Sequence, residues 1–185
     1  MGGDLKSKAR AQHQGGTMRM SVFDCNVFVQ AVAFPGAAYH CFAHVLQGPD
    51  RLLTSKYVLD EARYVLSMPW LQAKLPGITP KRVEALFHHL HRAAIYVERV
   101  PKLFEFPPDP DDAPYIDLAI QAGAFALVTR DREVLRLGEA DYELARRLRE
   151  RHPCLHLAIP ERFLELVDAK PSMSEMLKRR SVRRE

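Results

Sequence analysis

The sequence predicts one three-layer α/β domain, in which helices cover both faces of a central parallel sheet. Short apolar runs alternate along the chain with longer segments of helical periodicity. Strands that are separated by helices join through right-handed crossovers, which place the strands in parallel. The length of 185 residues suits a single domain with one core.

Five buried apolar runs are the expected strands, at residues 20–23, 52–54, 95–97, 125–129 and 156–159. The segments between them are the expected helices, at residues 26–33, 38–46, 55–67, 80–93, 112–123, 139–151 and 160–167. Local signals set several of these bounds: Ser55 is a helix N-cap, Pro80 follows Thr79 at a first helical position, and Gly48 stops a helix.

The net charge of +4 resides in the two ends of the chain. Three basic residues and one acidic residue in 1–17 give +2, and five basic and two acidic residues in 171–185 give +3, which leaves −1 for the rest. We expect 1–17 to be a disordered tail, 18–170 the folded domain and 171–185 a basic tail. Charge alone therefore does not predict a nucleic-acid partner.

Several classes of protein are excluded. No run of about 18 apolar residues occurs, so no membrane-spanning helix is expected, and the N-terminus lacks the apolar core of a signal peptide, which predicts a cytoplasmic protein. The three cysteines, Cys25, Cys41 and Cys154, have no CxxC spacing and are expected to be small core residues. The phosphate-binding pattern GxxxxGK[ST] is absent.

Four acidic residues are predicted to meet at one edge of the sheet. Asp24 and Asp131 follow strands, and Asp112 opens the helix before the Asp131 strand. Glu61 lies about two turns into the helix that leaves the second strand. Active sites of open parallel sheets gather at this edge. Converging carboxylates repel one another, and a hard divalent cation, Mg²⁺ or Mn²⁺, is the usual compensation. Hydrolysis of a phosphodiester bond is the chemistry that fits.

Each acid also has a purely structural explanation. Asp112 suits a helix N-cap, and Asp24 with Asn26 suits a turn before a helix. Glu61 suits a solvated helix face, and Asp131 suits a turn after a strand. The placement of all four at one edge, from independent strand and helix predictions, favours the metal site.

The acids fall in segments that resemble the motifs of one family. Residues 22–29 (VFDCNVFV) resemble the opening motif of the PIN-domain nucleases, and residues 55–66 (SKYVLDEARYVL) resemble their second, with Glu61 as its acid. Residues 109–114 (DPDDAP) and 128–135 (VTRDREVL) are similar to the third and fourth motifs. The likeness covers nearly all of residues 20–167, and it is strongest to the branch described as toxin components of toxin–antitoxin systems.

The resemblance implies a metal-dependent endoribonuclease with a sheet of about five strands. By that likeness Asp24, Glu61, Asp112 and Asp131 bind Mg²⁺ or Mn²⁺ and are catalytic. The implied partners are an RNA substrate, an antitoxin protein and a second copy of the chain, with no membrane. The alternative is a non-catalytic PIN-like scaffold that binds RNA or protein.

Residues around the acids carry secondary expectations. Cys25 stands where the family usually has Thr or Ser, and Ala113 replaces a common additional acid. Asn26 and Thr129 are expected to orient the carboxylates by hydrogen bonds.

Three further side chains have two interpretations each. Arg130 and Arg132 suit either neighbouring phosphates or an exposed basic pair. Trp70 suits the stacking of a base or, more often, the anchoring of a loop.

Overall fold

A computed structural model describes residues 18–168. Its centre is a five-stranded sheet in the order β3-β2-β1-β4-β5, and every neighbouring pair is parallel. The strands are β1 (Met20–Phe23), β2 (Arg51–Ser55), β3 (Ile95–Val97), β4 (Ala126–Val128) and β5 (His156–Ala158). The central position of β1 explains why three of its four residues are apolar, since both of its faces are buried.

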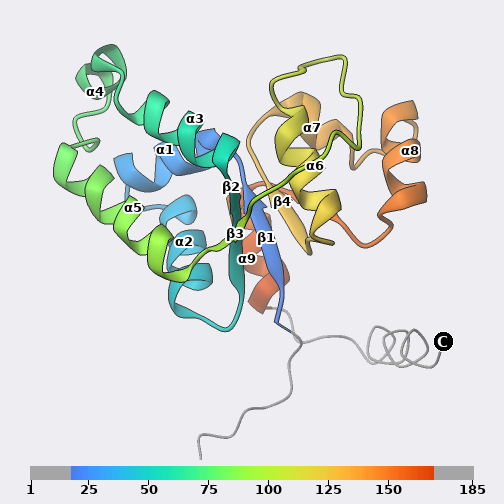
Figure 1. The fold of residues 1–185 in the computed structure, drawn as a ribbon, viewed down its shortest axis with the longest axis horizontal. Helices are drawn as coiled ribbons and strands as arrows, with labels where there is room; N and C mark the ends of the chain where they lie inside the picture. Colours follow the sequence, from blue (N-terminus) through green and yellow to red (C-terminus); the bar gives the residue numbers. More distant parts are fainter. Residues whose placement is uncertain (1–17, 169–185) are drawn as a thin grey trace, which may run out of the picture.

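Helices cover both faces of this sheet, as Figure 1 shows. The helices of the described chain are α1 (Cys25–Ala33), α2 (Ala37–Gln47), α3 (Lys56–Leu66), α4 (Pro69–Lys74), α5 (Pro80–Ala93), α6 (Ala113–Gln121), α7 (Arg132–Arg136), α8 (Glu143–Arg151) and α9 (Pro160–Asp168). Helices α1, α2, α5 and α9 pack together on one side, and α6 packs on β1, β2 and β4 from the other. The predicted three-layer α/β/α architecture is confirmed.

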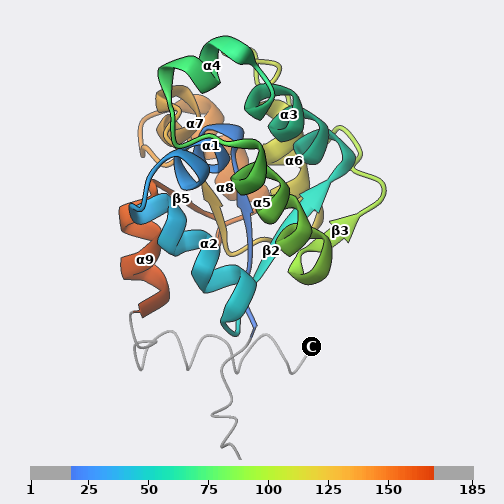
Figure 2. The same ribbon diagram turned by 90° about the vertical axis from the view of Figure 1, so that its left-hand side faces the viewer.

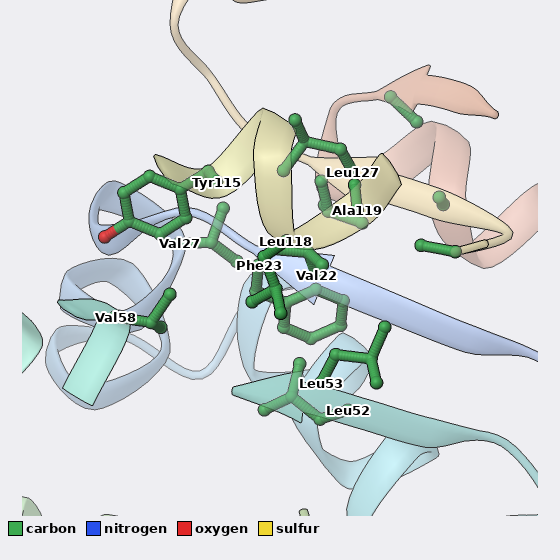
Figure 3. Close-up of a cluster of buried hydrophobic side chains, with 14 of the residues drawn as sticks. Val22, Phe23, Val27, Leu52, Leu53, Val58, Tyr115, Leu118, Ala119 and Leu127 are labelled. Carbon is green, nitrogen blue, oxygen red and sulfur yellow. The ribbon is translucent and has the colours of Figure 1, made fainter. Parts of the chain in front are cut away.

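The main core lies between these layers around the end of β1 (Figure 3). Phe23 is fully buried and meets Phe42 of α2 and Phe163 of α9 edge-on, with ring centroids 5.0 and 5.4 Å apart. Leu118 of α6 and Leu127 of β4 close the core from the other face. Edge-to-face aromatic pairs add about 0.5–1.5 kcal/mol each beyond their burial, so Phe23 ties two helices to the central strand.

A smaller core holds α4 against the end of α3. Leu66 and Leu71 pack there with residues from the end of α1. Gln72 also donates a hydrogen bond from Nε2 to the carbonyl oxygen of Leu66, at 2.8 Å. A Cβ on Gly77 would lie 2.1 Å from the carbonyl oxygen of Ala33, so only glycine allows this close approach of the chain after α4.

A buried ion pair lies at the amino ends of β1 and β2 and is connected to the last helix, α9. Asp50 is 2% exposed and accepts hydrogen bonds from the backbone N–H and the guanidinium of Arg19 and from His44. The same guanidinium donates to the carbonyl oxygens of Leu166 and Val167 in α9, at 3.3 and 3.0 Å. Burial alone would raise the pKa of Asp50, but the hydrogen bonds from His44 and Arg19 outweigh it and hold the pKa below its ordinary value.

The structure differs from the sequence prediction in a few elements. The helix expected at 139–151 begins only at Glu143, and the short helices α4 and α7 lie in segments for which the sequence analysis gives no helix. Cys25 and Cys41 are buried as expected, but Cys154 is exposed. Within the described chain no helix is long and apolar enough to cross a membrane. The tails expected at 1–17 and 171–185 lie outside the described residues.

Candidate metal centre

The sheet order creates a switch point at the carboxyl ends of β1 and β4. The chain leaves β1 toward β2 on one side, while β4 pairs with β1 on the other. Open α/β sheets bind ligands where the strand order reverses in this way. Asp24 follows β1 directly, and its backbone N–H donates to the carbonyl oxygen of Val128 at the end of β4, at 3.0 Å. The first and last acid segments are thus neighbours.

Asp24 is held by two side-chain hydrogen bonds. It is 6% exposed, and its Oδ2 accepts from the amide of Asn26 and from the hydroxyl of Thr129, both at 2.5 Å. Burial raises the pKa of Asp24, although the Thr129 hydrogen bond opposes that rise. Asn26 and Thr129 therefore make the contacts with Asp24 that the sequence predicts for them. The Asp24 carboxylate is therefore held in a buried position in which its ionised form is disfavoured.

The Thr129 hydroxyl also links Asp24 to Asp131. While it donates to Asp24, its oxygen accepts the backbone N–H of Asp131, at 2.8 Å. Asp131 is the N-cap of α7, and its Oδ1 accepts the backbone N–H groups of Glu133 and Val134, at 2.8 and 3.1 Å. Asp131 therefore caps α7, but only one of its two carboxylate oxygens accepts these hydrogen bonds.

Glu61 is oriented by a tyrosine that the sequence analysis did not single out. The hydroxyl of Tyr115 in α6 donates to Glu61 Oε2 at 2.6 Å. Tyr115 is 2% exposed, so its ring packs in the core and only its hydroxyl reaches the acid. Burial raises the pKa of Glu61, the Tyr115 bond lowers it, and the negative charge of Asp24 raises it further.

Asp112 begins α6 without capping it. Its backbone is already in the helical region, and its side chain makes no capping hydrogen bond. The carboxylate is therefore not used by the helix. Burial, followed by the charges of Asp24, Asp109, Asp131 and Glu61, raises the pKa of Asp112 to about 7. The other three predicted acids thus all act electrostatically on Asp112 at this edge.

Two further acids add to this negative field. Asp109 and Asp111 are exposed, and both raise the pKa of Glu61. In the sequence, the run of three acids in DPDD indicates that these further acids lie close to Asp112. Between residues 18 and 168, no three acid, histidine or cysteine side chains form a group that could hold a metal ion as they stand. The four acids are coupled by charge, and they do not form a closed set of ligands.

The donor set nevertheless has the chemistry that a divalent cation requires. The acids offer only carboxylate oxygens, the ligands that Mg²⁺ and Mn²⁺ prefer. Burial and mutual repulsion raise the pKa values of Asp24, Glu61 and Asp112. A cation would offset this penalty. Cys25 is a poor competitor as a ligand, since burial, with Glu61 and Asp24, raises the pKa of its thiol to about 12.

Other polar residues near the acids are committed elsewhere. Asp117 is buried and accepts the backbone N–H groups of Leu103 and Phe104, at 2.9 and 2.8 Å, so it fixes the segment before α6. Arg130 is bound to Gln30 and Glu161. Arg132 is exposed and makes no ion pair with any residue of the described chain. Of the two arginines, only Arg132 is free to meet a phosphate.

A groove of about 940 Å³ borders the acids without containing them. It lies between the segment before α6 and helix α8, and Tyr57 and Pro114 line it on the side of the acids. None of the four candidate acids lines this groove. The acids therefore lie on the rim of the sheet beside it.

The fold and the site define a class: a doubly wound α/β protein with a cluster of carboxylates at its switch point. A family model described as a PIN domain matches residues 21–133, which include all four acids. The chain belongs to the PIN domain family. PIN domains are generally nucleases, and they typically use divalent metals. Searches of curated proteins and of solved structures gave no match.

Loss of the Tyr115 hydroxyl is expected to weaken metal binding. In Tyr115→Phe the ring remains packed, but Glu61 loses its donor and its pKa rises further. Loss of such a supporting hydrogen bond costs about 10- to 100-fold in metal affinity, and we expect about 10-fold for Mn²⁺ by calorimetry at neutral pH. Tyr142→Phe, a half-buried tyrosine at the start of α8, is the control. Equal affinities in the wild type and Tyr115→Phe would contradict the role of Tyr115.

Proposed function

We propose that the protein is an Mg²⁺- or Mn²⁺-dependent endoribonuclease that hydrolyses phosphodiester bonds of RNA. The observation that carries the proposal is the electrostatic coupling of Asp24, Glu61, Asp112 and Asp131 at the switch point of a PIN domain. A charge cluster of this kind opposes folding unless it serves a ligand. The proposal extends the nuclease class to a particular cofactor and substrate.

The side chains have distinct tasks in this mechanism. Asp24, Asp112 and Asp131 would hold the cation, with Glu61 as a ligand or a partner through water. When bound, the cation supplies an activated water and neutralises the charge that builds on the phosphate. Asn26 and Thr129 fix Asp24.

The residues around the ligands complete the site. Tyr115 fixes Glu61, and Arg132 lies next to Asp131 with a free guanidinium for a neighbouring phosphate. Asp112 must lose a proton to act as a ligand, and its pKa of about 7 sets the pH at which it does so.

Titration of the full chain with Mn²⁺ tests the metal site first. We expect saturable binding that strengthens from about pH 6 to about pH 8, because Asp112 loses its proton across this interval. Asp112→Asn should weaken the binding and flatten its pH dependence. Asp60→Asn, an exposed neighbour of Glu61 on α3, is the matched control. Absence of Mn²⁺ binding, together with absence of RNA cleavage, would favour the non-catalytic scaffold.

We further propose that this nuclease is the toxin of a toxin–antitoxin pair, with an antitoxin protein and a second copy of the chain as partners. The support is the resemblance of the four motifs to that branch of the family. Expression of the wild-type chain in a bacterial host should arrest growth, and Asp24→Asn should not. Equal growth of the two cultures at equal protein levels would contradict the toxin role.

A further inference from the structure

The groove beside the acids has two walls that come from distant parts of the chain. One wall is the irregular segment 100–107 together with the start of α6, and the other is α8. In Figure 1 the segment that joins β3 to α6 passes beside α8. The groove volume of about 940 Å³ is at the upper end of the range for ligand sites, which leaves room for several residues of a peptide.

The irregular wall is fixed in place by contacts with both neighbouring helices. Asp117 of α6 accepts the backbone N–H groups of Leu103 and Phe104, at 2.9 and 2.8 Å. Arg151 of α8 donates to the carbonyl oxygen of Leu103, at 3.0 Å. The side chains of Phe104 and Phe106 are buried and anchor the segment in the core. A ligand would therefore meet a groove that needs little ordering when it binds.

The apolar surface of the groove suits aliphatic side chains. It includes Val100, Leu103, Pro107, Pro110 and Pro114, each exposed or half-buried. Of the described rings that line the groove, Phe104 and Phe106 are buried and Tyr57 is exposed. Trp70 is 61% exposed on α4, so it does not anchor a loop as the sequence favoured, and it lies outside the groove. The groove therefore offers no row of rings on which bases could stack.

Two arginines of α8 line the groove without a carboxylate partner. Arg147 and Arg151 are four residues apart and lie on the same face of the helix. Within residues 18–168, Arg147 makes no ion pair or hydrogen bond, and Arg151 donates only to a carbonyl oxygen. The neighbouring Arg146, by contrast, pairs with Glu143. Because a guanidinium can bind a carboxylate through two N–H groups, the groove has two positions for acidic side chains.

Two acids in the same groove disfavour a nucleic acid as its ligand. Glu150 of α8 and Glu105 of the opposite wall both line the groove, and neither has a basic partner in the described part of the chain. A nucleic acid carries a negative charge at every nucleotide, so some of its phosphates would lie next to these glutamates. A peptide can carry carboxylates only where the arginines are. The mixed charges thus favour a peptide with separated acidic residues.

We propose that the groove binds an extended segment of a partner protein, in which acidic side chains alternate with aliphatic ones. The acidic side chains bind Arg147 and Arg151, and the aliphatic ones pack on the opposite wall. This site goes beyond the proposed nuclease activity and does not depend on it, because none of the four candidate acids lines the groove. Pro110 and Pro114 flank Asp112 in the sequence, so the bound segment lies beside the acid site.

The spacing of the two arginines sets the spacing of the acids in the partner. Residues four apart on a helix rise by about 6 Å, and residues two apart on an extended chain rise by about 6.6 Å. Acidic side chains at positions i and i+2 of the segment therefore face Arg147 and Arg151 together. The side chains between them point the opposite way, toward the aliphatic surface of segment 100–107.

Selection from a library of random 12-residue peptides displayed on phage tests the groove without knowledge of the partner. The full chain is the target, and peptides that also bind the Arg147→Glu variant are removed. We expect the remaining peptides to share acidic residues two positions apart, with aliphatic residues between them. A synthetic peptide of the recovered sequence, followed by the anisotropy of a fluorescent label, should bind Arg147→Ala about tenfold more weakly than the wild type.

Matched variants separate the groove from other causes of binding. Arg146→Ala, which removes the adjacent arginine outside the groove, should leave the affinity unchanged. Arg147→Glu should bind the same peptide with lysines in place of its acids more tightly than the wild type does. Recovery of no peptide that distinguishes the wild type from Arg147→Glu would overturn the proposal, as would recovered peptides without acidic residues.

Two further outcomes would assign the groove to a different occupant. Weaker binding of a 12-nucleotide oligouridine in Arg147→Ala, measured in the Asp24→Asn background, would overturn the proposal in favour of a nucleic acid. Loss of a dimer in Arg147→Ala, measured by sedimentation, would overturn it in favour of a second copy of the chain. Cleavage of RNA by the wild-type chain decides the proposed function independently of these results.

Discussion

Asp24→Asn is expected to reduce RNA cleavage at least about 1000-fold, equivalent to about 4 kcal/mol of transition-state stabilisation. The substitution keeps the shape of the side chain, and an amide oxygen can still accept from Asn26 and Thr129. What it removes is the charge at the most buried of the four acids. Initial rates on a single-stranded RNA in Mn²⁺ measure the effect, with Asp60→Asn as the control.

The same substitution is expected to preserve or raise the melting temperature in EDTA. Burial raises the pKa of Asp24 in the folded protein, so its ionised form at neutral pH opposes folding. The corresponding loss of stability sets in as pH rises through that raised pKa, and an uncharged asparagine avoids it. Added Mn²⁺ should stabilise the wild type and not the variant. Full activity in Asp24→Asn would refute the assignment of Asp24, and a collapse of stability would show a structural role instead.

Asp50→Asn is expected to lower the free energy of unfolding by about 3 kcal/mol, because it leaves the charge of Arg19 without its buried partner. For a domain of this size that loss corresponds to roughly 6–12 °C in melting temperature. Asp60→Asn removes one partner of an exposed pair with Lys56, and its effect on stability should be much smaller because solvent screens that pair. Thermal and urea unfolding at neutral pH compare the two variants.

The pH dependence distinguishes loss of charge from loss of packing at Asp50. The pKa of Asp50 is lowered in the folded protein, so its contribution to stability is complete above its unfolded pKa of about 4. That contribution is lost as pH falls from there through the lower folded pKa. The difference in stability between the wild type and Asp50→Asn should therefore shrink in acid. A difference that stays constant down to about pH 2 would contradict the ion-pair explanation.

The sequence is sufficient to predict the sheet because its central strands are buried on both faces and read as apolar runs. Asp24, Asp112 and Asp131 could be placed at one edge because each lies at the end of a strand or the start of a helix. Helix α7 has five residues, too few to show a helical period, and Pro69 begins α4 as well as ending the helix before it. Such short elements carry no periodic signal.

The contacts that orient the site could not be read from the sequence. Tyr115 meets Glu61 across 54 residues, and Asp50 meets Arg19 across 31. Local spacing says nothing about which side chains meet over such separations. Asn26 and Thr129 could be anticipated because they lie within two residues of a predicted acid. Local sequence can also predict a contact that does not form: Asp112 stands at the position of a helix cap, yet its side chain makes no capping hydrogen bond.

The contacts of Thr129 make the geometry of the site depend on the order in which the chain is synthesised. It bonds to Asp24 across 105 residues, and the backbone N–H of Thr129 donates to the carbonyl oxygen of Ala158 in β5. A nascent chain that has not yet been extended through β5 lacks the strand that holds Thr129. The hydrogen-bonded arrangement that holds Asp24 is therefore completed only after the last strand of the sheet has been made.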